Sequence, residues 1–163
     1  MNNSDYISIA SATIALLAFV VTIWQGWITR AHNILSVTPL LHINIDDTDG
    51  LKYSIENHGL GPGIIKDFII RVGNNVYENP VRDPYPEIIQ SINLCSMQYE
   101  YFLPTEGSAL LPEHPKILLS LKFTDPNSNV YSYAQVEEKI EFEIQYQSIY
   151  KNKTFKCSSR WAG

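Results

Sequence analysis

A stretch without any charged side chain runs from Tyr6 to Thr29 and ends at Arg30. At a rise of 1.5 Å per residue, about 22 helical residues reach roughly 33 Å, enough to cross a hydrocarbon core of about 30 Å. We therefore expect residues 1–30 to form one transmembrane α-helix in a lipid bilayer. A secretory signal peptide would instead have a basic start, a short apolar core and a small-x-small cleavage site. This segment lacks that pattern, so cleavage is not expected.

The residues at the end of this stretch predict its orientation. Trp24 and Trp27 are typical of the aromatic belt at a membrane–water interface. Arg30 follows the stretch, and no basic residue precedes it. Because cytoplasmic flanks carry the excess of Lys and Arg, we expect the N-terminus outside and the following domain in the cytoplasm.

A second pattern lies within the same stretch, where small or polar residues recur at alternating spacings of three and four. This period of 3.5 places them on one narrow seam of a helix. The seam comprises Ser8, Ser11, Ala15, Ala18, Thr22, Gln25 and Thr29. One interpretation is a plain anchor or a dimerisation face, because small residues let helices approach closely. The other is a parallel homo-oligomer, such as a tetramer, whose helices line a pore with the seam.

The 133 residues after Arg30 are enough for one domain with its own core. Once Arg30 and Asp5 are set aside, 11 of the 12 basic and 16 of the 17 acidic residues remain, a net charge of −5. An acidic domain of this kind is not expected to bind duplex DNA. Cys95 and Cys157 have no CxxC or metal-ligand spacing, and the four histidines are scattered. We therefore expect free thiols, no metal and no cofactor.

Alternating apolar and polar residues predict an all-β domain over 39–163, an antiparallel β-sandwich or small barrel, after a short joint at 31–38. Residues 41–45 and 51–56 should form a hairpin that turns at 46–50, and 64–72 should form a central strand. Further strands are expected at 117–123, 130–134, 140–146 and 154–157, which gives seven or eight in all.

A Pro-rich and aromatic-rich insertion interrupts the strand pattern at about 80–115, with a short helix expected from Glu87 to Met97. Long insertions of this kind are often binding loops. With nearby basic residues, its rings would suit a nucleotide or oligonucleotide, since Arg binds phosphate and aromatic rings stack on bases. The candidate ligand-binding residues are Lys66, Arg71, Arg82, Tyr85, Tyr99 and Tyr101. Alternatively, the rings close one end of the sandwich, and Lys66 and Arg71 pair with Asp67 and Glu56.

No catalytic residue is predicted, because the chain lacks a Gly-x-Ser-x-Gly elbow, a Cys–His pair and metal-ligand spacing. Glu141 and Glu143 could suggest a pair of catalytic carboxylates. Their spacing of two in an expected strand instead predicts that both lie on its solvent face.

The segment from Asn57 to Gly63 contains three glycines and Pro62 between two predicted strands. We expect a tight connection in which glycine supplies positive φ angles. No helix carrying Lys-Ser/Thr is expected after it, so it is not a phosphate-binding loop.

Two short motifs carry a resemblance: Ser36-Val37-Thr38-Pro39 and Asn57-x-Gly59-x-Gly61-Pro62. With the single span, they resemble a group of small bacterial membrane proteins of mobile and defence regions, which have an N-x-G-x-G-P-A pattern before a β-rich cytoplasmic domain. Gly63 departs from the usual Ala. The resemblance covers about residues 7–72 and implies a bacterial inner-membrane location. The layout is also similar to channel-type anti-phage effectors, such as the membrane effector of Hailong systems.

These expectations combine into a homo-oligomeric membrane effector that conducts ions and is controlled by a nucleotide or oligonucleotide on its cytoplasmic domain. The alternative is a membrane-anchored adaptor that presents its β-sandwich to a protein partner without conducting. A membrane-anchored enzyme with an unrecognised site is a third class, for which the sequence supplies no motif.

Overall fold

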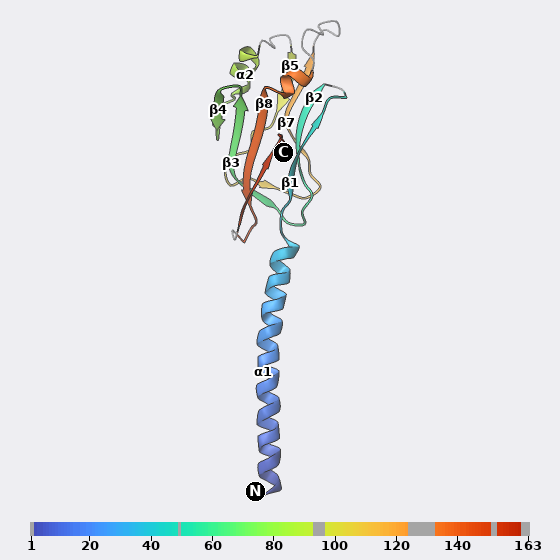
Figure 1. Cartoon of the computed structure of the whole chain (residues 1–163), viewed down its shortest axis with the longest axis vertical. Helices are drawn as coiled ribbons and strands as arrows, with labels where there is room; N and C mark the ends of the chain where they lie inside the picture. Colours follow the sequence, from blue (N-terminus) through green and yellow to red (C-terminus); the bar gives the residue numbers. More distant parts are fainter. Residues whose placement is uncertain (1, 49, 93–96, 124–132, 151–152, 161–163) are drawn as a thin grey trace. The chain divides into compact units, whose positions relative to one another are not determined.

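The computed structural model describes the chain apart from residues 1, 49, 93–96, 124–132, 151–152 and 161–163. It divides into two compact units, Met1–Ser36 and Val37–Gly163. The predicted fold class is confirmed: one long apolar N-terminal helix precedes an all-β domain of two antiparallel sheets (Figure 1).

Helix α1 spans Asn3–Ser36 and is long and apolar enough to cross a membrane. None of its residues is buried in the single chain. It continues past Arg30, so most of the joint predicted at 31–38 is helical. At 1.5 Å per residue its 34 residues extend about 51 Å, which exceeds the hydrocarbon core by several turns.

The first sheet has the strand order β1-β2-β7-β5, all antiparallel. Its strands are β1 (Leu41–Asp46), β2 (Leu51–Asn57), β5 (Met97–Tyr101) and β7 (Lys116–Phe123). The predicted hairpin is confirmed, since Leu41 pairs with Asn57 and Ile43 with Ile55. Sheet formation at β5 was not predicted, because this strand lies inside the expected irregular insertion.

The second sheet has the order β4-β3-β8-β9, with β6 paired to the start of β3. Its strands are β3 (Gly63–Val72), β4 (Asn75–Glu78), β6 (Ala109–Leu110), β8 (Ile140–Gln147) and β9 (Thr154–Ser158). Strand β3 lies between β4 and β8, as expected for a central strand.

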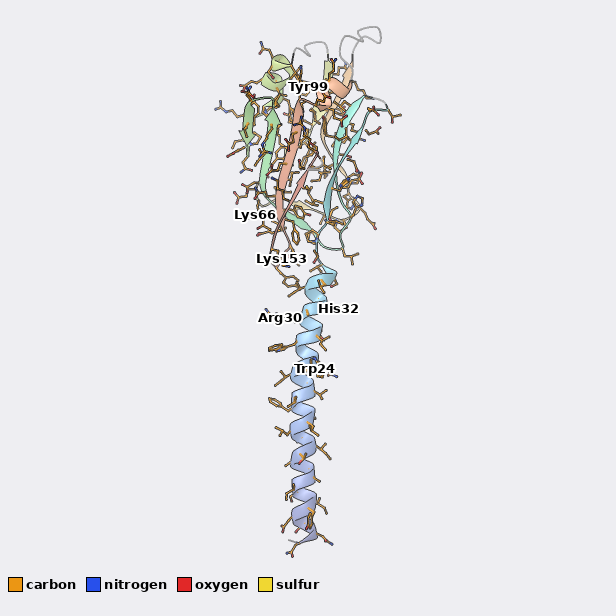
Figure 2. All side chains as sticks on the ribbon, in the orientation of Figure 1. Trp24, Arg30, His32, Lys66, Tyr99 and Lys153 are labelled. Atoms are coloured by element: carbon orange, nitrogen blue, oxygen red, sulfur yellow. The ribbon has the colours of Figure 1, made fainter. Side chains whose placement is uncertain are left out.

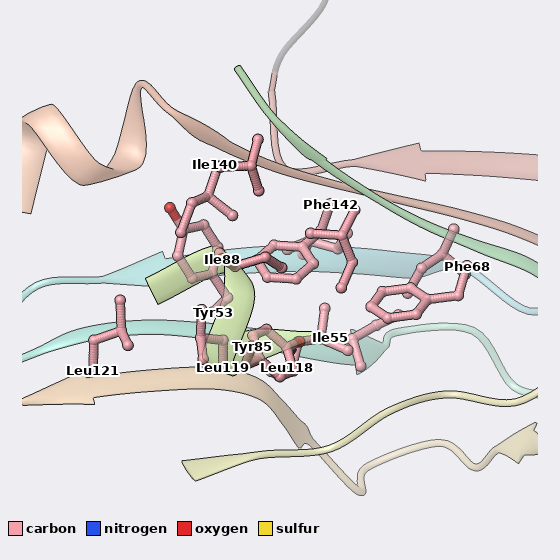
Figure 3. Close-up of a cluster of buried hydrophobic side chains, with 14 of the residues drawn as sticks. Tyr53, Ile55, Phe68, Tyr85, Ile88, Leu118, Leu119, Leu121, Ile140 and Phe142 are labelled. Atoms are coloured by element: carbon pink, nitrogen blue, oxygen red, sulfur yellow. Dashed lines mark hydrogen bonds between the residues drawn. The ribbon is translucent and has the colours of Figure 1, made fainter. Parts of the chain in front are cut away.

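The core lies between the sheets and is built from the inward-facing residues of both. The ring of Tyr53 on β2 packs 4.8 Å from that of Phe142 on β8, which stacks on Phe68 of β3 (Figure 3). Helix α2 (Tyr85–Ser91) adds the buried side chains of Tyr85, Ile88 and Ile89. The insertion therefore contributes part of the core.

Two predicted elements differ from the structure. Helix α2 begins near Pro86, as expected, but ends at Ser91 rather than Met97, where β5 begins. Of the predicted strand at 130–134, residues 130–132 lie outside the described residues, and Tyr133–Glu137 forms the short helix α3. Alternation over only five residues was too short to distinguish these two structures.

Candidate functional site

The β domain begins with the entry segment, Val37–Leu41. Three hydrogen bonds join the main chain of this segment to residues of other elements. The amide of His58 donates to the carbonyl of Leu40 at 2.8 Å. The amide of Leu40 donates to Oδ1 of Asn57 at 3.1 Å, and that of Leu41 donates to the hydroxyl of Tyr146 at 3.2 Å. The end of β2, the residue after it and strand β8 therefore fix this segment.

Asn57, at the end of β2, is buried and uses its whole side-chain amide. Its Nδ2 donates to the carbonyls of Gly61 and Leu110, at 2.8 and 2.9 Å. Its Oδ1 accepts from the amides of Leu40 and Gly59. An amide offers two donors and one oxygen with two lone pairs, so all four positions are filled. One side chain thus joins the entry segment, the glycine loop and β6.

We call residues 58–62, between β2 and β3, the glycine loop. Its glycines, Gly59 and Gly61, are required because the entry segment passes directly over them. A Cβ on Gly59 would lie 2.4 Å from the carbonyl oxygen of Thr38, and one on Gly61 only 2.0 Å from that of Val37. Neither glycine is among the residues with positive φ. The prediction that glycine here supplies positive φ is therefore wrong. Its role is to allow close approach of two backbones.

We call Asn57, Gly59, Gly61 and the entry segment the clamp. Residues 37–39 of the first short motif noted in the sequence lie directly against Gly59 and Gly61 of the second. Their contact could not be read from the sequence, because it depends on the register that places Leu41 opposite Asn57. The clamp thus fixes the backbone of the first residues of the β domain.

A groove of about 700 Å³ lies beside the clamp, between the glycine loop and the segment before β7. Its walls carry imidazole and carboxylate groups, and His58 Nε2 lies 3.6 Å from Glu56 Oε2. Its lining residues are Glu56, Asn57, His58, Gly59, Leu60, Pro112, Glu113, His114 and Pro115. Among the described residues, no group of three or more His, Cys, Asp or Glu side chains could hold a metal ion.

The three tyrosines predicted to stack on a ligand do come together. The rings of Tyr85 and Tyr101 lie 4.9 Å apart, and Tyr99 lies 6.5 and 6.1 Å from them. Tyr85, however, is fully buried, and its hydroxyl donates to the carbonyl of Leu118 at 2.9 Å. Tyr85 therefore has no face free for a base, whereas Tyr101 and Arg82 are exposed.

Lys66 and Arg71 lie on β3 of the second sheet, whereas Tyr99 and Tyr101 lie on β5 of the first; Figure 2 shows Lys66 and Tyr99 well apart on the β domain. Lys66 pairs with Glu106 at 3.7 Å, and Arg71 pairs with Glu143 at 2.5 Å. Their partners are thus not Asp67 and Glu56, but both cations are already paired.

The prediction that Glu143 lies on a solvent face is wrong, because this residue is buried. Its side chain is 4% exposed because Arg71 on β3 and Lys156 on β9, 2.9 Å away, close over it. Burial acts to raise the pKa of Glu143, but the bonds from Lys156 and Arg71 outweigh it and lower the pKa below its ordinary value. Glu143 is therefore a buried ion-pair partner. Glu141 is more exposed and lies 3.8 Å from Arg71.

Cys157 is a free thiol in β9, as predicted, and half-buried. Burial raises its pKa to about 12, so at neutral pH it is protonated and weakly reactive. Cys95 lies outside the described residues.

The seam residues of α1 are all exposed in the single chain. The hydroxyls of Ser8, Ser11 and Thr22 each donate to the carbonyl four residues earlier, at 2.8 to 2.9 Å. A seven-residue repeat drifts by about 20° per heptad on a straight helix, so across three heptads the seam stays on one side. It thus presents small groups and hydroxyl oxygens with free lone pairs.

In comparisons with known proteins, no family model, no curated protein and no solved structure matches this chain.

Proposed function

We propose that the protein is a homo-oligomeric, single-pass effector of the bacterial inner membrane in which the cytoplasmic β domain controls a bundle of α1 helices. The clamp is the observation that supports this proposal most. A domain that needed only anchoring could hang on a flexible linker. Here Asn57 and two glycines hold the backbone of Val37–Leu41, the first residues after the helix. In this proposal, a rearrangement of the sheets reaches the helices through that segment.

The seam supplies the contact between helices in this proposal. Lipid tails give helices no hydrophobic reason to pair, so association depends on close packing and interhelical hydrogen bonds. Ala15 and Ala18 would allow close approach, and Gln25 would find a partner amide or water in the bundle. Conduction through a path lined by these uncharged groups would discriminate weakly between ions. Its biological output would be membrane permeabilisation in anti-phage defence.

The controlling ligand is proposed to be a nucleotide or oligonucleotide that contacts the exposed Arg82 and Tyr101. One observation favours the alternative, a protein-binding adaptor. Lys66 and Arg71 are paired with carboxylates, and Tyr85 is in the core. Of the six expected ligand groups, only Arg82 and Tyr101 are exposed, and the Tyr101 hydroxyl is hydrogen-bonded to Asp83.

Substitutions on opposite sides of α1 test the proposal. We expect Ala18→Leu to break the oligomer in lipid nanodiscs and abolish ion flux from liposomes, because a larger side chain separates the backbones. Val20→Ala, on the lipid side, should leave both unchanged. Gln25→Leu should remove flux while leaving the β domain folded. Oligomers without flux in the unsubstituted protein would support the adaptor, and a monomer in the bilayer would overturn the homo-oligomeric effector.

A further inference from the structure

Exposed apolar side chains gather at one end of the β domain. Of the eight large apolar residues exposed in its described part, five lie where the chain enters from α1. We call these five the apolar rim: Leu40, Leu60, Leu111, Ile149 and Tyr150. The other three, Val76, Val81 and Tyr101, lie elsewhere.

The strand register places the rim residues together, although they are far apart in sequence. Leu40 precedes Leu41, whose partner is Asn57, and Leu60 is in the loop after Asn57. Leu111 follows Leu110, which pairs with Gly63 at the other end of that loop. Ile149 and Tyr150 are in the turn after Gln147, which pairs with Ile64. One face of loops and turns thus carries all five.

Chain length keeps this end of the domain close to the bilayer. The six residues from Ala31 to Ser36 add about 9 Å of helix after Arg30. The polar headgroup layer on each side of a bilayer is of similar thickness, roughly 5–8 Å. Val37 therefore emerges near the outer limit of the headgroups. Leu40 is three residues further on, and the clamp ties Leu40 to the loop that carries Leu60.

We propose that the apolar rim docks on the bilayer that α1 spans, with Leu60 and its neighbours inserted among the headgroups. Leu, Ile and Tyr side chains suit this layer, since apolar groups gain by burial and Tyr keeps its hydroxyl wet. Leu60 is 78% exposed at the tip of the glycine loop.

The contact is apolar rather than electrostatic. The same end carries the carboxylates of Glu56 and Glu113 beside the groove. It also carries the exposed Lys116, which pairs with Ile55, and Lys153, which precedes the partner of Gln147, so charges of both signs lie there. Attraction to anionic headgroups would need an excess of Lys and Arg. The partner is therefore a zwitterionic or mixed lipid surface entered by apolar side chains.

This inference rests on the proposed membrane span of α1, and the test separates the two. The full chain carries one engineered cysteine, Leu60→Cys, Val81→Cys or Ile14→Cys, bearing an environment-sensitive fluorophore in phosphatidylcholine liposomes with nitroxide-labelled lipid. Unsubstituted chain, labelled in parallel, corrects for Cys95 and Cys157. Val81 is the matched control, because it is 97% exposed and follows β4, which pairs with the opposite end of β3.

We expect the label at position 60 to shift to the blue and lose most of its emission to the nitroxide lipid, and the label at position 81 to keep its emission. Quenching at position 14 reports the span. If position 14 is quenched while position 60 behaves like position 81, the docking is refuted and the span stands. If position 14 is not quenched, the span itself fails. Quenching at position 60 that requires added phosphatidylglycerol, or crosslinking of position 60 between copies without lipid quenching, would also overturn apolar docking.

Discussion

The two ends of the β domain are held by different kinds of contact. At the clamp, the Asn57 side chain bonds four main-chain groups, and the backbones approach so closely that only glycine fits at positions 59 and 61. Near the tyrosine cluster, side chains from α2 and β5 fill space over the sheets, with Tyr85 as the largest buried group. A backbone contact transmits displacement because it cannot repack, whereas a packed side chain mainly adds stability. The clamp therefore fixes the position of the entry segment, and the tyrosine cluster mainly stabilises the fold.

Removal of Tyr85 is the strongest test of the claim that the tyrosine cluster stabilises the fold. We expect Tyr85→Ala to lower the free energy of unfolding by about 4 kcal/mol, because it leaves a core cavity and removes the hydroxyl bond to the Leu118 carbonyl. Tyr101→Ala should cost less, since Tyr101 is 41% exposed. Urea denaturation of the β domain in the full chain, followed by tyrosine circular dichroism, measures both. Equal stability of Tyr85→Ala and the parent would return Tyr85 to a ligand-binding role.

At the clamp we expect Gly61→Ala to cost about 3 kcal/mol, because the added methyl group cannot fit beside the Val37 carbonyl without moving backbone. Gly73→Ala is the matched control: its φ is +58° and nothing lies within 4 Å, so only backbone strain of about 1–2 kcal/mol applies. The same denaturation experiment compares them. If Gly73→Ala proves the more damaging, close approach is not what the clamp glycine provides.

Glu143, on β8 of the second sheet, offers a third kind of contact to compare with the clamp and the tyrosine cluster. Its contribution to stability depends on pH. Its folded-state pKa is below its ordinary value of about 4.5, so it contributes stability above that pH and loses the contribution as pH falls through the folded-state pKa. Glu143→Gln should cost about 2 kcal/mol at pH 7, less than a fully buried pair because Arg71 and Lys156 are partly exposed.

The pH dependence of the free energy of unfolding, measured for the parent and for Glu143→Gln, tests this contribution. The parent should lose more stability than Glu143→Gln between pH 7 and pH 3, because the variant has already lost this titrating group. Parallel pH profiles of the two proteins would show that the ion pair contributes no net stability.

The features that could be predicted are those fixed by local pattern. Alternation gave the hairpin of β1 and β2 and the central position of β3, and hydropathy with length gave α1. The contacts that were missed depend on pairing between distant strands. Glu143 alternates like a solvent-facing residue, and only the neighbours Arg71 and Lys156 make it buried.

The candidate site was predicted less well for the same reason. The aromatic insertion was predicted to be a ligand-binding loop. A large ring beside a sheet, however, most often packs into the hydrophobic core, as Tyr85 does. The glycine loop was recognised as a connection, but its partner, the carbonyl of Val37, is about twenty residues earlier and was set by sheet register. The pair Glu113 and His114 between two prolines was the one sequence signal that could have pointed to the groove.

The clamp also fixes an order of events during synthesis. Its parts emerge from the ribosome far apart in time: the entry segment follows the helix at once, Asn57 comes about twenty residues later, and the Leu110 carbonyl and Tyr146 hydroxyl come later still. Chains grow at roughly 5–20 residues per second. For several seconds, therefore, the entry segment exists without the partners that hold it. If the helices associate as proposed, they would have that interval to meet before the clamp closes.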